Sequence, residues 1–369
     1  MERIGQAETD ELKDIFAGSL NGLIRHMYPL FRWFLFRLDP ETAHQLTLQT
    51  LRLAGNFPLS NWLLTQFYKV PSKPVQAFGL TFKNPVGLAA GYDKDGMAIK
   101  GLAALGFGHV EIGSITPKAQ PGNPRPRVFR LVEDEAVINR MGFPGRGADF
   151  VVNTLGRSNL PTFRRSNVLL GINLGKNKNT PLEEAAQDYI QLMRRFIFHA
   201  DYLTINISSP NTVGLRRLQG REMLEQLLKS IQTEREEIAL ERGGNTPVLV
   251  KISPDMSEGE LEDAVGVVLD QGMDGIIATN TTLARDGLRS KYRGETGGLS
   301  GSPLAAGSEA VLHQVVKLVK GRIPIKSVGG IMKPEVAKKR LALGASLVQL
   351  YTGLIYRGPK LVQDIVKTL

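Results

Sequence analysis

The chain of 369 residues contains no cysteine. Structural disulfides, zinc or iron–sulfur centres with thiolate ligands, and a thiol nucleophile are therefore all excluded. Histidine is sparse, with five scattered residues and no pair at the HExxH spacing of a zinc site, so we expect no metal centre. Functions that depend on thiol chemistry or on a histidine-bound metal are set aside.

Long hydrophobic runs are also missing, although a membrane-spanning helix needs about 20 mostly apolar residues in a row. The most apolar stretch, residues 30–38 (LFRWFLFRL), is interrupted by Arg32 and Arg37. Residues 1–14 are rich in acidic side chains, unlike a secretory signal. We therefore expect neither a transmembrane helix nor a secretory leader.

Negative charge is in deficit, which leaves a formal net charge of +10 and a pI near 9.7. Such a balance favours a polyanionic partner: a nucleic acid, an anionic lipid surface or a phosphorylated ligand. A surface with surplus lysine explains it equally well, and charge alone does not separate these alternatives.

The first part of the chain, residues 1–70, has helical patterns and is predicted to be an appendage. Apolar residues follow helical spacing in residues 21–36. A second helix is predicted from Asp39, which would cap it, to about Leu53, ending before Gly55. Ser60 is predicted to cap a short third helix.

The second part, residues 77–369, alternates strand-like and helical segments. It opens with a predicted hairpin at residues 77–82 that turns near Lys83 and Asn84. Alternating strands and helices indicate parallel βαβ units, and eight of them match an α/β fold of the (β/α)8 (TIM) barrel type. A doubly wound open sheet is the alternative, but no GxGxxG follows the first strand. The eight predicted strands are residues 86–90, 110–115, 169–174, 202–207, 248–252, 275–279, 323–328 and 347–351.

Polar side chains gather at the carboxyl ends of these predicted strands, where a barrel has its active site. Alternation places Asn173, Asn206 and Lys251 on the face opposite their apolar neighbours, lining the barrel mouth. The glycine-rich segments 329–330 and 351–353 follow the last two strands, the usual phosphate site of this fold. Each residue alone is explained as a satisfied core amide or a turn former, but together they favour a polar, phosphorylated ligand.

Several long motifs resemble those of one family, in the same order and over nearly the whole chain. They are Ala89–Gly96 (AAGYDKDG), Asn139–Phe143 (NRMGF), Gly171–Asn177 (GINLGKN), Asn206–Thr212 (NISSPNT), Lys251, Thr279–Thr281 (TNT), Gly297–Gly301 (GGLSG), Val328–Ile331 (VGGI) and Gln349–Gly353 (QLYTG). With these motifs the chain resembles the class 2 dihydroorotate dehydrogenases, which are membrane-associated, quinone-dependent FMN enzymes.

The resemblance implies oxidation of (S)-dihydroorotate to orotate in pyrimidine (UMP) biosynthesis, with electrons passing through FMN to ubiquinone or another membrane quinone. It implies FMN contacts for Ala90, Gly91, Lys94, Ser114, Asn173, Asn206, Lys251, Thr279, Gly301, Gly330, Tyr351 and Thr352. It implies dihydroorotate or orotate contacts for Lys94, Asn139, Arg140, Met141, Gly142, Phe143, Asn206, Asn211, Asn280 and Thr281.

Ser209 matches the family's general base, and Thr212 and Phe143 complete the implied catalytic set. Serine is a weak base, so it needs a helper such as an ordered water or the hydroxyl of Thr212. Lys251 is implied to stabilise negative charge on the reduced flavin. Class 1 relatives use a cysteine base, which this chain lacks.

The aromatic, arginine-flanked segment 21–38 has two interpretations. It is either a helix that covers one end of the barrel or an interfacial helix that lies in a membrane surface. The resemblance favours the second and implies a quinone tunnel lined by His44 and Arg130. We expect a peripheral membrane protein of the bacterial inner membrane (cytoplasmic face), or of the mitochondrial inner membrane if the source is eukaryotic. We also expect a monomer with no nucleic-acid partner.

Three other functions compete with this hypothesis. A tRNA dihydrouridine synthase would explain the basic pI, but its chemistry needs a cysteine acid. A non-catalytic membrane-binding scaffold would predict a degraded set of strand-end residues, whereas the set is intact. A soluble dehydrogenase that reduces fumarate or NAD is disfavoured by the N-terminal helices. Residues 285–302, rich in glycine and basic residues, are predicted to be an active-site lid.

Overall fold

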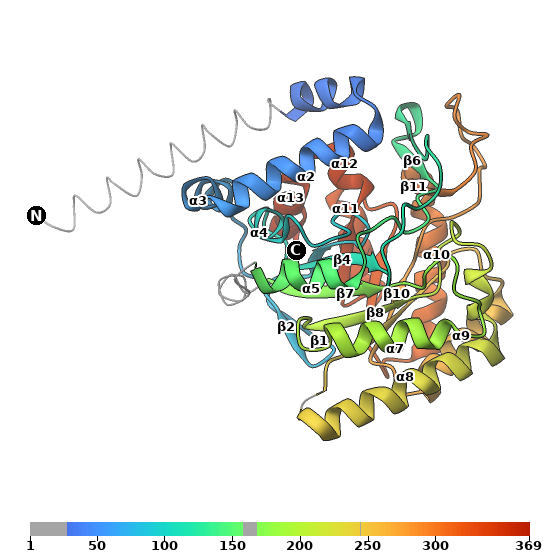
Figure 1. The fold of residues 1–369 in the computed structure, drawn as a ribbon. Coiled ribbons are helices and arrows are strands. Elements are labelled where there is room, and N and C mark those ends of the chain that lie inside the picture. The colour runs from blue at the N-terminus through green and yellow to red at the C-terminus, as the bar shows by residue number, and fades with distance from the viewer. Residues whose placement is uncertain (1–27, 158–167, 244) are drawn as a thin grey trace, which may run out of the picture.

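The computed structural model describes residues 28–157, 168–243 and 245–369 (Figure 1). Eight parallel strands close into a barrel in the order β10-β12-β13-β3-β4-β7-β8-β9, which confirms the predicted (β/α)8 fold. The barrel strands are β3 (Val86–Leu88), β4 (His109–Ile115), β7 (Leu169–Leu174), β8 (Tyr202–Asn206), β9 (Val248–Ile252), β10 (Gly275–Ala278), β12 (Ile325–Val328) and β13 (Leu347–Leu350). Each lies within two residues of its predicted bounds.

Helices surround the barrel (Figure 1). They are α4 (Ile99–Ala103), α5 (Ala148–Arg157), α7 (Ala185–Phe196), α8 (Arg221–Arg242), α9 (Glu258–Asp270), α10 (Ala305–Val319), α11 (Pro334–Ala342), α12 (Thr352–Arg357) and α13 (Lys360–Thr368). Short 3-10 turns are η1 (Val132–Asp134), η2 (Leu215–Gln219) and η3 (Ser302–Leu304).

Strand alternation divides the buried side chains into an outer and an inner set. In β9, Val248, Val250 and Ile252 belong to the large cluster between strands and helices, whereas Leu249 belongs to the small cluster inside the barrel. Lys251 has the parity of Leu249 and so points inward. Because the apolar set faces the helices, polar residues of the opposite parity are left to line the interior.

A hairpin of β1 (Val75–Ala77) and β2 (Leu80–Phe82) adds its aromatic side chains to the inner cluster. Its turn lies at Phe78 and Gly79, so the predicted turn near Lys83 and Asn84 is wrong. Both turn residues have positive φ, 55° and 72°, as a tight two-residue hairpin turn requires. The sequence signal was missed because phenylalanine is an unusual residue in that conformation.

The chain from residue 28 to residue 67 is helical, as predicted: residues 28–37, α2 (Pro40–Asn56) and α3 (Pro58–Phe67). Residues 1–27, including the start of the predicted first helix, lie outside the described residues. Asp39 caps α2, accepting from the backbone N–H groups of Glu41 and Thr42 at 3.1 and 2.9 Å, as predicted.

Two details of these helices were predicted wrongly. Helix α2 runs through Gly55, where a Cβ would lie 2.3 Å from the backbone nitrogen of Gly101 in α4. Glycine is needed there for close helix packing and not as a cap. Ser60 lies inside α3, and its hydroxyl donates to the carbonyl of Ala54 at 2.7 Å, while Phe57 takes the cap position.

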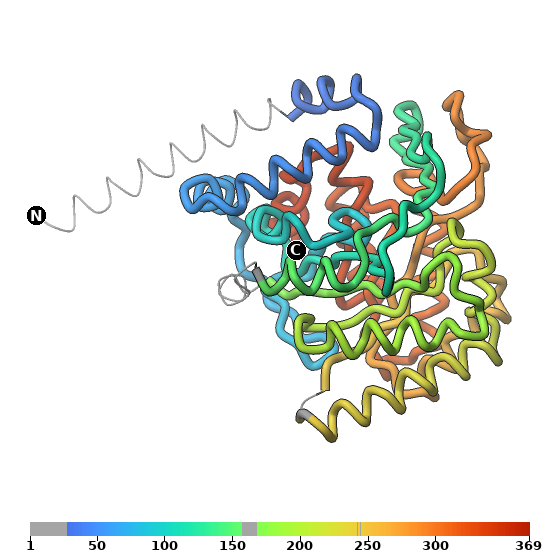
Figure 2. The backbone as a smooth tube through the Cα atoms, in the orientation of Figure 1, coloured from blue at the N-terminus to red at the C-terminus, as the bar shows by residue number. Residues whose placement is uncertain are grey.

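The first and last segments of the described chain lie side by side (Figure 2). The hydroxyl of Tyr28 donates to the carbonyl of Ile355 at 2.7 Å, and the Arg32 guanidinium to that of Tyr356 at 2.9 Å. In α13, the Gln363 amide donates to the carbonyl of Phe67 at 2.8 Å. The C-terminal helices therefore fix the N-terminal helices over the barrel.

A three-stranded antiparallel sheet, not predicted from the sequence, stands beside the barrel. It consists of β5 (Val128–Leu131), β6 (Ala136–Asn139) and β11 (Gly298–Gly301), in the order β11-β6-β5. Strand β11 takes up the end of the segment predicted to be a lid, which fixes that end in a sheet. The earlier part of that segment, residues 285–297, forms a loop before β11.

Candidate functional site

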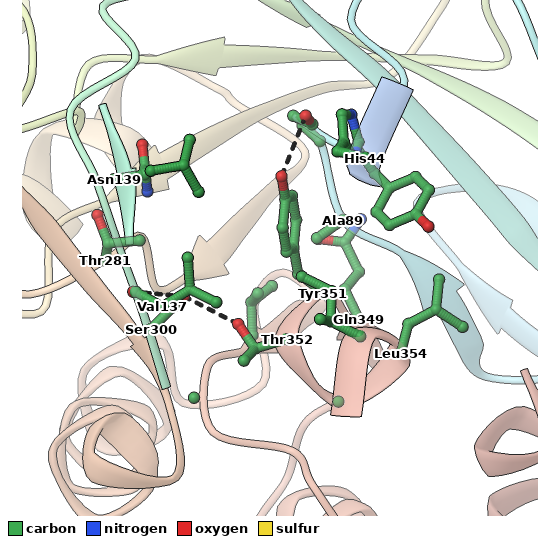
Figure 3. A pocket seen from close by; sticks show the side chains of 18 of the residues that line it. His44, Ala89, Val137, Asn139, Thr281, Ser300, Gln349, Tyr351, Thr352 and Leu354 are labelled. Atoms are coloured by element: carbon green, nitrogen blue, oxygen red, sulfur yellow. Dashed lines mark hydrogen bonds between the residues drawn. The ribbon is translucent and has the colours of Figure 1, made fainter. Parts of the chain in front are cut away.

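A cavity of about 380 Å³ runs from the N-terminal helices to the strand ends at the barrel mouth (Figure 3). His44 on α2 lies at one side, Asn139 and Thr281 at the other, and Tyr351 between them. Most of the predicted site residues line it: His44, Ala90, Gly91, Lys94, Ser114, Arg130, Asn139, Met141, Gly142, Phe143, Asn206, Ser209, Asn211, Lys251, Thr279, Asn280, Thr281, Gly301, Gly330, Tyr351 and Thr352. The structure thus brings together residues that the sequence spreads over more than 300 positions.

Three predicted residues are not among those that line the cavity. Asn173 lies directly behind its wall and is fully buried. Arg140 points to the loop before β11, where it forms an ion pair with Glu295 at 2.7 Å. Thr212 is buried after the serine-rich loop, and no hydrogen bond joins its side chain to Ser209 within the described residues.

Amide side chains form a hydrogen-bonded cluster at the ends of β4, β7 and β8. The Nδ2 of Asn206 donates to the hydroxyl of Ser114 at 2.7 Å and to Oδ1 of Asn173 at 3.0 Å. The Ser114 hydroxyl donates to the same Oδ1. These contacts satisfy groups that would be costly to bury alone, and they fix the orientation of Asn206 at the cavity wall.

Further amides continue the polar wall from β8 across to β10 and the outer sheet. The Nδ2 of Asn280 donates to Oγ of Ser208 at 3.0 Å and to Oδ1 of Asn206 at 3.3 Å. The Nδ2 of Asn211 donates to Oδ1 of Asn139 at 3.1 Å. This wall offers amide donors and acceptors to the cavity, which suits the amide edges of a small heterocycle.

Ser209 lies in the loop after β8, is 5% exposed and lines the cavity. Its Oγ accepts a hydrogen bond from the backbone N–H of Asn211 at 3.3 Å. The loop is held from behind by Arg216, whose guanidinium donates to the carbonyls of Ser208 at 3.1 Å and of Thr281 at 2.9 Å. The Ser209 hydroxyl proton has no acceptor among the described residues, so it is free to bond a ligand or water.

Two lysines bring positive charge to the cavity. Burial lowers the pKa of Lys94 to about 8, although Glu41 and Asp95 oppose the shift, and its ammonium donates to the carbonyl of Gly91 at 2.7 Å. Burial also lowers the pKa of Lys251, which forms no hydrogen bond or ion pair within the described part of the chain. A buried ammonium without a partner is costly, so its presence at a cavity favours an anionic or carbonyl-bearing ligand.

A glycine-lined cradle forms one end of the cavity, at Gly301, Gly330 and Thr352. Gly330 has φ +71°, and a Cβ there would lie 2.3 Å from the Cα of Ala305. The hydroxyl of Thr352 donates to that of Ser300 at 2.8 Å (Figure 3). Backbone N–H groups in such glycine-rich turns, next to the N-terminus of α10, form an anion-binding concavity.

The other end of the cavity lies under the N-terminal helices and is mostly apolar. His44 packs edge-on against Tyr92, with ring centroids 5.0 Å apart, and burial together with the charge of Lys94 lowers the pKa of His44 to about 3. Arg130 donates to the carbonyl of Leu35 at 2.8 Å, and its guanidinium lies 4.7 Å from the ring centroid of Phe36. A neutral histidine and a fixed guanidinium are therefore among the few polar groups of a mostly apolar passage.

Glu111, Lys326 and Gln349 were missed in the sequence. They lie inside the barrel, and the Gln349 amide donates to the Glu111 carboxylate at 2.8 Å. The same alternation that identified Lys251 would have identified Glu111 on β4 and Lys326 on β12 as inward-facing. Both stand in short apolar runs, where a single charge is easily assigned to the surface.

Within the described residues, no helix is both long enough and apolar enough to cross a membrane. No group of three or more potential metal-ligating side chains occurs there either.

Comparisons with known proteins agree on one family. The profile described as Dihydroorotate dehydrogenase matches residues 73–369. A dihydroorotate dehydrogenase (quinone) of Azotobacter vinelandii is 48% identical over 93% of this chain and 96% of its own length. One of Idiomarina loihiensis is 49% identical over 93% and 100% of the two chains.

Solved structures give the same result. A ligand-free dihydroorotate dehydrogenase of Eimeria tenella superposes with a TM-score of 0.81 at 41% identity, covering 89% of this chain and 93% of that one. The same enzyme in complex with ferulenol gives 0.79 at 39% identity, covering 89% and 90%. From its strand-end residues, its fold and these likenesses, the chain belongs to the dihydroorotate dehydrogenase family, with the quinone-dependent members as its relatives.

Proposed function

We propose that the chain oxidises (S)-dihydroorotate to orotate, with FMN as hydride acceptor and a membrane quinone as final electron acceptor. The observation that carries this proposal is the continuous cavity, which joins the polar wall at the barrel mouth to the apolar passage under α2 and α3. Its two ends suit a polar substrate and an apolar electron acceptor. Residues 77–369 then form the catalytic barrel, and residues 1–70 the quinone tunnel and membrane-binding part.

We propose that a phosphorylated flavin, FMN, occupies this cavity. The cradle at Gly301, Gly330 and Thr352 suits the phosphate, and Lys251 would face the part of the ring system that gains negative charge. Ala90, Gly91, Ser114, Thr279 and Tyr351 line the space between. The flavin, when bound, supplies the acceptor for the hydride that leaves C6 of the substrate.

The substrate is proposed to lie against the amide wall. Asn139, Asn206, Asn211 and Asn280 offer donors and acceptors to the amide edges of the pyrimidine, and the Lys94 ammonium attracts its carboxylate. Met141, Gly142, Phe143 and Thr281 close the space around it. Ser209 faces the cavity and is proposed to take the proton from C5 through Oγ while its own hydroxyl proton passes to an ordered water, because no described side chain accepts that proton.

The quinone is proposed to enter under α2 and α3 and to pass His44 and Arg130. The outer faces of the N-terminal helices support a membrane surface as its source. Large apolar side chains there are strongly exposed, among them Leu30 (71%), Trp33 (58%), Leu59 (70%) and Trp62 (57%). Such a face, combined with arginines and a basic chain, suits an interfacial helix pair. We propose a monomeric peripheral protein on the cytoplasmic face of a bacterial inner membrane.

Purified protein tests this proposal directly. We expect a yellow protein whose bound flavin, extracted by denaturation, is FMN, and which reduces a ubiquinone analogue when supplied with dihydroorotate. A protein that stays colourless after incubation with FMN, or one that is inert with every quinone analogue, would refute the proposal. Flotation with anionic lipid vesicles tests the membrane part separately.

A further inference from the structure

A buried carboxylate, Glu111, lies inside the barrel one hydrogen bond behind the cavity wall. It is 0% exposed and stands on β4, two residues before Gly113. Neither oxygen of this carboxylate is left unpaired, because each accepts from side chains on other strands. The three donors, Asn173, Tyr202 and Gln349, are at most 1% exposed. The Glu111 carboxylate is therefore part of the barrel interior.

The first oxygen of Glu111 sets the direction of an amide chain. Its Oε1 accepts from Nδ2 of Asn173 at 2.9 Å, so Oδ1 of Asn173 must face the other way. That Oδ1 accepts from Nδ2 of Asn206 at 3.0 Å, which leaves Oδ1 of Asn206 to accept from Nδ2 of Asn280 at 3.3 Å.

In this series of hydrogen-bonded side chains, the Glu111 carboxylate is the member that cannot exchange donor and acceptor. An amide presents either a donor or an acceptor after a 180° flip, but an ionised carboxylate only accepts. The orientation of the Asn173 amide therefore follows from Glu111. The orientation of Asn206 follows from Asn173 together with the backbone N–H of Ser208, which donates to Oδ1 of Asn206 at 3.3 Å. The amide that Asn206 presents to the cavity is thus held from inside the barrel as well as by its own loop. The amide of Asn280 is oriented by the backbone N–H of Thr281, which donates to its Oδ1 at 2.8 Å.

The second oxygen of Glu111 is held by the opposite side of the barrel. Its Oε2 accepts from the Gln349 amide at 2.8 Å and from the Tyr202 hydroxyl at 3.1 Å. The Lys326 ammonium lies 3.7 Å away and 3.7 Å from the Tyr202 ring centroid. Burial lowers the pKa of Lys326 to about 7, an effect that the Glu111 charge opposes.

We propose that Glu111 is a positioning residue, which acts through Asn173 to orient the amide of Asn206 for binding the pyrimidine ring, while Lys326 balances its charge. This inference rests on the proposed function. It assigns to the barrel interior a share in substrate recognition, through side chains that lie behind those proposed to contact the substrate.

Two double variants separate the hydrogen bond from the charge. Glu111→Gln with Lys326→Met removes both charges but keeps an oxygen that can accept from Asn173, and the new NH2 can face Oε1 of Gln349, which has no hydrogen-bond partner in the described structure. Glu111→Met with Lys326→Met has nearly the same volume and no acceptor. Replacement of a buried ion pair by neutral side chains is often tolerated.

The measurement is orotate binding to the flavin-loaded protein, followed by the change in flavin absorbance, together with kcat and KM for dihydroorotate. We expect the dissociation constant for orotate and the KM to be about tenfold higher in the methionine pair than in the glutamine pair. Thermal melting of the two variants controls for a purely structural role, which would lower stability without a selective loss of orotate affinity.

If the two double variants bind orotate with equal affinity while the wild type is active, the role assigned to Glu111 is overturned and the proposed function stands. Wild-type protein that neither binds orotate nor oxidises dihydroorotate would overturn the proposed function and this assignment with it. If the methionine pair does not fold, Asn173→Ala leaves the Glu111–Lys326 pair in place and removes the link. We expect the same selective loss of orotate affinity there, and unchanged affinity would refute the inference.

Discussion

Asn211 donates through Nδ2 to Oδ1 of Asn139 at 3.1 Å, which ties the serine-bearing loop after β8 to the edge of the outer sheet. Asn123 strengthens the same junction, because its Nδ2 donates to the backbone carbonyls of Asn211 at 3.1 Å and Arg140 at 3.0 Å. The loop that carries Ser209 is therefore held from two sides, which keeps its hydroxyl in place at the cavity.

Replacement of that hydroxyl gives the first prediction. Ser209→Ala should slow reduction of the bound flavin by dihydroorotate by about 10²- to 10⁴-fold, the usual contribution of a general base. FMN content should stay normal, because Ser209 is not part of the glycine cradle. Stopped-flow bleaching of the flavin measures the step.

Ser230→Ala is the matched control, since that hydroxyl lies on α8 and donates to the carbonyl of Gln226 at the surface. Its flavin reduction rate should equal that of wild type. Near-normal reduction in Ser209→Ala would remove Ser209 from the role of base.

Much of the barrel could be predicted because its strands are short apolar runs between helices of clear periodicity. The same alternation predicted that the side chains of Asn173, Asn206 and Lys251 point into the barrel, and the structure places each of them inward. Strand alternation is a local property, so the sequence carries it directly.

Features that depend on packing between distant segments could not be predicted in the same way. Gly55 resembles a helix terminator until Gly101 of α4 is seen against it. Asn173 was expected to contact FMN. In the structure it lies behind the cavity wall, where its amide forms hydrogen bonds with Glu111, Ser114 and Asn206. Which polar groups pair with each other is decided only when the barrel closes.

The depressed pKa of Lys94 predicts a pH dependence of substrate binding. Burial lowers this pKa from 10.5 to about 8, so the ammonium is charged below pH 8 and becomes neutral as the pH rises above it. The carboxylate of dihydroorotate stays ionised throughout, so its attraction to Lys94 is lost only on the alkaline side. The KM for dihydroorotate should rise up to about tenfold per pH unit above pH 8.

Lys94→Met provides the comparison for this profile. Its KM should be high already at neutral pH and should not rise further between pH 8 and 9.5. A wild-type KM that stays flat over this range, measured in one mixed buffer at constant ionic strength, would contradict the predicted titration.

His44 should affect the quinone half of the reaction and not the substrate half. Its ring lies against Tyr92 at the apolar end of the cavity, on the far side of Tyr351 from Asn139 (Figure 3). His44→Ala should raise the KM for a ubiquinone analogue several-fold, while the rate of flavin reduction by dihydroorotate stays within about twofold of wild type.

Gln45→Ala controls for general damage to α2, because that neighbouring side chain is exposed. It should leave both half-reactions unchanged. Equal losses in both half-reactions of His44→Ala would instead indicate that the substitution disturbs the whole cavity.

The glycine cradle can be tested with a pair of substitutions that share backbone strain but differ in contacts. Gly330 has φ +71° and Gly321 has φ +75°, so alanine is strained at both, at a cost of about 1 kcal/mol each. At Gly321 the added Cβ meets nothing within 4 Å, whereas at Gly330 it would lie 2.3 Å from the Cα of Ala305. The backbone of the cradle must therefore move in Gly330→Ala alone.

That movement should displace the N–H groups that face the proposed phosphate. We expect Gly330→Ala to weaken FMN binding more than about tenfold, while its affinity for riboflavin, which has no phosphate, changes much less. Gly321→Ala should show a modest loss of thermal stability and normal FMN binding. Equal losses of FMN and riboflavin in Gly330→Ala would mean that this end of the cavity holds another part of the cofactor, because only a phosphate-specific effect distinguishes the two ligands.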